Sequence, residues 1–87
     1  MVHVFVPVQL RSLTKGQAQV LSKASNVNGA IDDLDRRFPG FRERLVIDDR
    51  IRPGLAVGVN GSISSLGLRA PVRDEDEIHF LPAIGGG

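Results

Sequence analysis

The chain has 87 residues, a formal net charge of +1 at pH 7 and no cysteine. This length allows one domain with a modest core, so a roomy buried catalytic cleft is not expected, and the lack of cysteine excludes disulfides, thiolate metal sites and cysteine nucleophiles. A near-neutral charge gives no global field for nucleic acid, and no stretch approaches the ~20 apolar residues of a membrane span, so we expect a cytoplasmic protein with neither a nucleic-acid nor a membrane partner.

The N-terminal segment has the pattern of a strand followed by a hairpin turn. Valine occupies every second position from Val2 to Val8, which is the period of a strand with one buried face. Thr14-Lys15-Gly16 is a turn signal, and residues 18–21 then resume extended character. We therefore expect an N-terminal β-hairpin.

The hydrophobic period changes at Asn26, which is a good helix N-cap. Aspartates follow early and arginines late, which matches the helix dipole at both ends. Phe38-Pro39-Gly40 ends this helix, and residues 41–45 are predicted to add a short extra turn. The apolar residues that recur at helical spacing are Val27, Ala30, Ile31, Leu34 and Phe38.

The second half of the chain reads as short strands joined by turns. A polar loop is expected over 48–54, followed by a strand over 55–59. Asn60-Gly61 supplies the residues that a type I′ turn requires, so Ser62-Ile63 should return as the second arm of a hairpin. A turn over 71–77 then leads into a last strand over 78–81.

This order of elements predicts an α+β fold in which one helix packs on a mixed sheet, the β-grasp arrangement of ubiquitin-like proteins. The amphipathic helix would bury its apolar side on one face of the sheet. We expect a single domain over 1–82, and a flexible C-terminal tail over 83–87 that ends in Gly-Gly.

The sequence offers little for side-chain catalysis or metal binding. His3 and His79 could lie on adjacent strands, but two histidines without a third ligand make a poor metal site, so we predict none. What remains is the tail Gly85-Gly86-Gly87, whose backbone can thread into a narrow active site because it lacks side chains. The reactive group would then be the α-carboxylate of Gly87.

Several motifs together resemble a known family. They are Gln9-Leu10-Arg11-Ser12-Leu13 after the first strand, Ala30-Ile31 and Leu34 in the helix, Val59-Asn60-Gly61 at the hairpin, and residues 74–84 leading to Gly86-Gly87. In these motifs the chain resembles the ubiquitin-like sulfur-carrier proteins of the ThiS/MoaD type. The segment 36–45 is most similar to carriers of the cysteine-biosynthesis branch, although molybdopterin-pathway carriers are similar elsewhere and the branch stays open.

The resemblance implies a protein co-substrate and not an enzyme. In that family an E1-like activating enzyme uses ATP to adenylate the terminal carboxylate, here that of Gly87. A sulfur donor then converts the acyl adenylate to a thiocarboxylate, which serves a sulfur-accepting synthase in cysteine, molybdopterin, thiamine or related biosynthesis. No bound cofactor is implied.

The resemblance also implies a docking surface on the exposed sheet face near the tail. The positions that it places there are Pro7, Arg11 and Leu81, with Leu66 and Leu68 as neighbours. If Ile78 and Phe80 fill the core, Leu81 should face away from the helix.

One departure from the family concerns the acidic turn, where Glu75 stands in place of the usual glycine and would be strained if its backbone is left-handed. Three alternatives remain besides the sulfur carrier: a ubiquitin-like modifier joined to other proteins through Gly87, the small subunit of a molybdopterin synthase, and a plain β-grasp binding module whose tail has no role.

Overall fold

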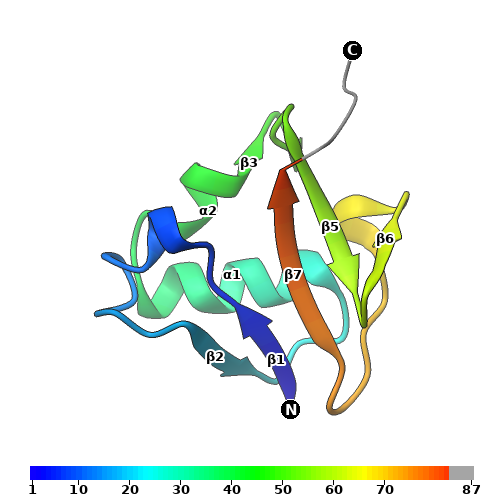
Figure 1. Cartoon of the computed structure of the whole chain (residues 1–87), viewed down its shortest axis with the longest axis horizontal. Coiled ribbons are helices and arrows are strands. Elements are labelled where there is room, and N and C mark those ends of the chain that lie inside the picture. Colours follow the sequence, from blue (N-terminus) through cyan, green and yellow to red (C-terminus); the bar gives the residue numbers. More distant parts are fainter. Residues whose placement is uncertain (83–87) are drawn as a thin grey trace.

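A five-stranded mixed sheet lies on one face of the helix α1, and the last strand of the chain, β7, is the central strand of this sheet (Figure 1). The computed structural model describes residues 1–82; the predicted tail over 83–87 lies outside the described residues. The strand order is β2-β1-β7-β5-β6, and only the central pair β1 and β7 is parallel. The strands are β1 (Val2–Phe5), β2 (Gln19–Ser22), β5 (Leu55–Val59), β6 (Ser62–Ser64) and β7 (Glu77–Pro82). The β-grasp prediction is confirmed.

The predicted N-terminal hairpin is present, but its first strand is shorter than expected. β1 and β2 pair antiparallel, and the valines at 2, 4 and 6 are buried. Val8, however, is 71% exposed, so its assignment to the buried face was wrong. The chain leaves the sheet at Pro7 and enters a short 3₁₀ turn, η1 (Val8–Leu10), which buries Leu10 instead.

The main helix, α1 (Val27–Arg37), begins where the sequence indicated. The side chain of Asn26 caps it by accepting a 2.7 Å hydrogen bond from the backbone N–H of Gly29. Its apolar residues at 27, 30, 31 and 34 are fully buried, and Phe38 packs against this core while remaining partly exposed. The predicted extra turn is α2 (Phe41–Leu45), which Gly40 enters with a φ of +99°.

The expected polar loop over 48–54 contains a small hairpin, so that prediction was incomplete. β3 (Val46–Ile47) pairs with β4 (Arg50–Ile51), and Asp48 and Asp49 both adopt left-handed backbone angles between them. Aspartate is among the residues that tolerate this conformation, which explains a tight turn without glycine. The Asn60-Gly61 turn has positive φ at both residues, as its type requires.

The core lies between α1 and the inner face of the sheet, and the short 3₁₀ helix η2 (Gly67–Arg69) closes one end of it. Within residues 1–82, no helix has the length and apolar character needed to cross a membrane.

Candidate functional site

The end of β7 fixes the direction in which the chain leaves the sheet. Leu81 and Pro82 are in register with Ala56 and Leu55 of β5, so β7 stays paired with β5 up to its last residue. Leu81 is 40% exposed and faces away from the helix, whereas the neighbouring Ile78 and Phe80 are buried, as expected. The residues predicted to carry the chemistry, Gly85, Gly86 and Gly87, follow this strand and lie outside the described part of the chain.

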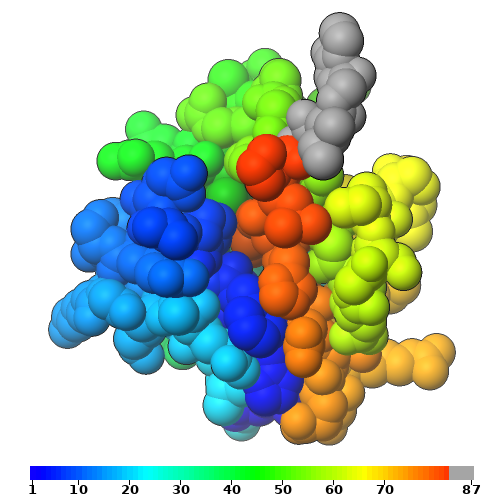
Figure 2. Space-filling model, viewed as in Figure 1, coloured from blue at the N-terminus to red at the C-terminus, as the bar shows by residue number. Residues whose placement is uncertain are grey.

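One residue from each of four neighbouring strands, β1, β7, β5 and β6, forms a row across the outer face of the sheet, and these strands lie side by side in Figure 2. The rings of Phe5 on β1 and His79 on β7 stack with centroids 4.2 Å apart and planes 10° from parallel. His79 is in register with Gly58, which in turn is in register with Ile63 on β6. Because Ile63 is 62% exposed, the row ends in an accessible aliphatic side chain.

The opposite end of β7 is acidic and hydrogen-bonded. The imidazole Nε2 of His3 lies 3.0 Å from a carboxylate oxygen of Glu75, and its Nδ1 contacts the side-chain amide of Gln19. The Met1 ammonium donates a 2.6 Å hydrogen bond to Asp74. The hydrogen bond to Met1 lowers the pKa of Asp74, and the one to His3 lowers the pKa of Glu75.

Asp76 links this acidic turn to the neighbouring β5–β6 hairpin by hydrogen bonds. Its carboxylate accepts hydrogen bonds of 2.8 Å from the side chain of Asn60 and from the backbone N–H of Arg73, and these bonds lower its pKa. Glu75 has a φ of +70°, so the position where the family usually has glycine is indeed left-handed. The two ends of β7 therefore differ: an acidic turn precedes it, and the exposed apolar side chain of Leu81 lies near its end.

The structure separates the five predicted docking residues. Pro7 and Arg11 are half-buried, and the Nε of Arg11 donates to the backbone carbonyl of Val6 at 3.1 Å. Leu66 is 47% exposed, in the loop between β6 and η2. Leu68 belongs to the core, where α1 and η2 meet, and its proposed docking role is corrected for this reason. For the other four residues docking stays a prediction.

Sequence reasoning expected His79 to face solvent, but it did not identify Phe5 and Ile63 as members of this face. The strand pattern contained the signal for Phe5, because the residue between two buried valines must point outward. His3 and His79 do lie on adjacent strands, and residues 1–82 contain no group of three or more histidine, aspartate or glutamate side chains placed to hold a metal ion.

This mixed sheet, packed on one helix and ending in a central strand that leads into the glycine tail, defines a small ubiquitin-like β-grasp protein. A model of the ThiS family matches residues 4–87, and the chain belongs to that family. It is 34% identical to the sulfur carrier protein CysO of Mycobacterium tuberculosis strain H37Rv, with 99% of this chain and 98% of that protein covered.

Solved structures agree with this assignment. The chain superposes on a crystal structure of the Amycolatopsis orientalis BexX/CysO complex with a TM-score of 0.88, 37% identity and full coverage of both chains. The crystal structure of M. tuberculosis CysO matches with a TM-score of 0.86 and 29% identity, over 97% of this chain and 100% of that one.

Proposed function

We propose that this protein is a sulfur carrier whose Gly87 carboxylate is activated and converted to a thiocarboxylate. The observation that carries the proposal is the likeness to a sulfur carrier over 99% of the chain, together with the run Gly85-Gly86-Gly87. The absence of cysteine supports it further, because no side chain of this protein can hold a transferable sulfur. The expectation of a cytoplasmic protein is part of the same proposal.

The proposed chemistry proceeds in two balanced steps on the carboxylate of Gly87. The carboxylate attacks the α-phosphorus of ATP, which forms an acyl adenylate and releases pyrophosphate. A sulfide-equivalent donor then attacks the carbonyl carbon and displaces AMP, which leaves a thiocarboxylate. The protein contributes the reactive carboxylate and the segment Gly85-Gly86-Gly87, which is narrow enough to enter the partner's active site because glycine has no Cβ.

A partner enzyme must recognise the folded part of the carrier. A similar protein has been crystallised in a complex with BexX, which supports docking of this fold on a partner enzyme. We propose that the E1-like activating enzyme binds the outer sheet face beside Pro82, where Leu81 is exposed and Pro7 and Arg11 are expected to lie at the margin. The sulfur-accepting synthase would use the same end of the molecule, because both partners act on the same carboxylate.

The intact mass of protein purified from its own host tests the proposal. A carrier should show a fraction in which one oxygen has been exchanged for one sulfur, and tandem fragmentation should place that exchange on Gly87. With a cognate activating enzyme, ATP and a sulfide donor, the same product should form in vitro. Deletion of Gly87 should abolish both products, and conversion of the truncated protein would contradict the proposal.

A further inference from the structure

The strand β2 forms one edge of the sheet, far in the strand order from the β5–β6 hairpin. The backbone N–H of Val6 donates to the carbonyl of Ala18. In an antiparallel pair every second residue is hydrogen-bonded to the neighbouring strand, so Val20 and Ser22 bond to β1. The backbone N–H and C=O of Leu21, which lies between them, therefore point away from the sheet. An unpaired edge of this kind can accept another extended chain unless it is protected.

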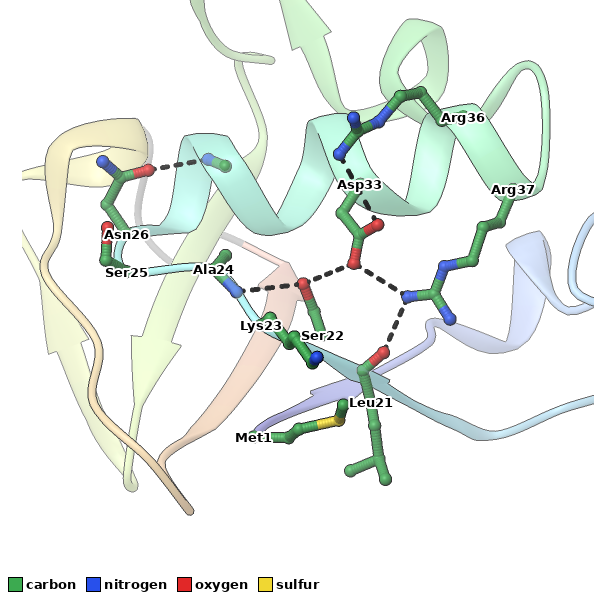
Figure 3. Close-up of a pocket in the computed structure, with 11 residues that line it drawn as sticks. Met1, Leu21, Ser22, Lys23, Ala24, Ser25, Asn26, Asp33, Arg36 and Arg37 are labelled. Atoms are coloured by element: carbon green, nitrogen blue, oxygen red, sulfur yellow. Dashed lines mark hydrogen bonds and ion pairs between the residues drawn. The ribbon is translucent and has the colours of Figure 1, made fainter.

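A network anchored on α1 occupies part of this edge (Figure 3). The guanidinium of Arg37 donates to the backbone carbonyl of Leu21 at 2.6 Å and to the carboxylate of Asp33 at 3.0 Å. The same carboxylate accepts from the buried hydroxyl of Ser22 at 2.7 Å and pairs with Arg36 at 3.6 Å. The network therefore uses an outward backbone acceptor of β2 and the carboxylate oxygens of Asp33.

A hollow of about 620 Å³ lies over this network, between β2 and the face of α1 that runs from Gly29 to Arg37. With Leu21 O and Asp33 engaged, the polar groups that remain for a ligand are mostly donors: the outward N–H of Leu21, the cationic end of Lys23, and Arg36, whose pair with Asp33 is long at 3.6 Å. Lys23 is exposed and the Arg36 side chain is 77% exposed, so both can turn toward a ligand. The hollow is thus both cationic and rich in donors.

We propose that this hollow is a second docking site, which binds an acidic, extended segment of a partner protein. Carboxylates of the segment would pair with Lys23 and Arg36, and one of its backbone carbonyls would accept from the N–H of Leu21. An edge strand suits a peptide better than a nucleic acid, and none of the described residues that line the hollow is an aromatic that could stack on bases. This site is independent of the sulfur chemistry and leaves the outer sheet face free.

The test uses the full-length protein labelled with ¹⁵N and an acetylated hexaglutamate peptide as the probe, at low ionic strength. We expect saturable amide shifts centred on Leu21 and Lys23 that weaken steeply as salt is added. A hexalysine peptide should produce none. A single-stranded oligonucleotide that binds at Leu21 more tightly than hexaglutamate would overturn the proposal in favour of a nucleic-acid surface.

Charge reversal supplies the matched comparison. Lys23→Glu combined with Arg36→Glu should weaken hexaglutamate binding by about tenfold or more, because two attractive charges become repulsive. Lys15→Glu combined with Arg44→Glu changes the net charge equally at exposed positions elsewhere and should leave binding nearly unchanged. Equal weakening by both pairs, or shifts spread over the whole surface, would mean non-specific attraction and would overturn the proposal. If the first pair fails to fold, the shift map and salt dependence of the wild type decide alone. Neither result bears on thiocarboxylate formation.

Discussion

Leu81 lies against Gly58 across the pairing of β7 with β5: its Cδ1 is 3.6 Å from the point that a Cβ on Gly58 would occupy. The other atoms near that point, the backbone oxygen of Ser62 and the Cβ of His79, are 3.8 and 3.9 Å away. All three distances are ordinary van der Waals separations, and Gly58 is not among the residues with positive φ. Neither space nor backbone conformation therefore requires glycine here.

Gly58→Ala should consequently fold normally and be as stable as the wild type, or more stable by about 0.4–1 kcal/mol, because alanine reduces the entropy of the unfolded chain. Gly61→Ala is the matched control. Gly61 has open space around its Cα but a φ of +85°, so alanine there should destabilise the protein by about 1 kcal/mol. Urea unfolding of both variants measures the difference, and equal losses would contradict it.

Leu81→Glu should leave the thermal midpoint almost unchanged while sharply reducing adenylation by the activating enzyme. The side chain is 40% exposed, so a carboxylate there stays hydrated, but it would be buried in the proposed interface. Leu21→Glu is the control, since Leu21 is 45% exposed on β2, away from the chain exit. A large loss of stability in Leu81→Glu, or an equal loss of adenylation in both variants, would remove Leu81 from the docking surface.

The sequence predicted those elements whose ends are determined locally. Asn26 caps α1 through its own side chain, Pro39 and Gly40 stop the helix, and Asn60-Gly61 adopts the backbone angles of its turn. Each of these signals acts within a few residues, so no knowledge of the tertiary structure is needed to interpret it.

The errors came from residues whose surroundings are set by distant parts of the chain. Val8 continues the alternation of β1, but Pro7 has already turned the chain away from the sheet, and periodicity carries no information on that turn. Leu68 looked like a neighbour of the tail, yet η2 packs it against α1. The stack of Phe5 on His79 requires the parallel pairing of the first and last strands, which local patterns cannot supply.

Asp33→Ala should destabilise the protein by about 1–3 kcal/mol, because it removes the acceptor shared by the buried Ser22 hydroxyl and by Arg37. Asp32→Ala is the control on the same helix. Asp32 is half exposed, and among residues 1–82 its carboxylate pairs with Arg42 only, at 2.8 Å, so its loss should cost less than about 1 kcal/mol. Denaturant unfolding at neutral pH compares the two variants, and a larger loss for Asp32→Ala would contradict this account of the network.

The free energy of unfolding should decrease in acid, partly because the carboxylate of Asp76 becomes protonated. The pKa of Asp76 is lowered in the folded state. The carboxylate therefore adds its full share to the free energy of unfolding above the unfolded-state pKa of about 4, and this share is lost as the pH falls through the lower folded-state pKa. Asp76→Asn keeps an acceptor for Asn60 but cannot titrate, so the drop in stability between neutral pH and about pH 3 should be smaller than in the wild type. Urea midpoints measured across this range test the assignment, and parallel curves for wild type and Asp76→Asn would refute it.

The last prediction separates a carrier from a protein modifier, since an activated carboxylate on Gly87 could serve either role. A thiocarboxylate must be delivered into a second enzyme's active site, so a carrier is recovered free, whereas a modifier accumulates in bands of higher mass joined through an isopeptide bond. Lys15 and Lys23 are the only lysines in the chain, which disfavours polymers built on the protein itself but leaves single attachment to other proteins open. We expect a tagged copy expressed in its host to run almost entirely as free protein, and to carry sulfur on Gly87 during growth that demands sulfur. Abundant isopeptide conjugates without detectable thiocarboxylate would favour the modifier instead.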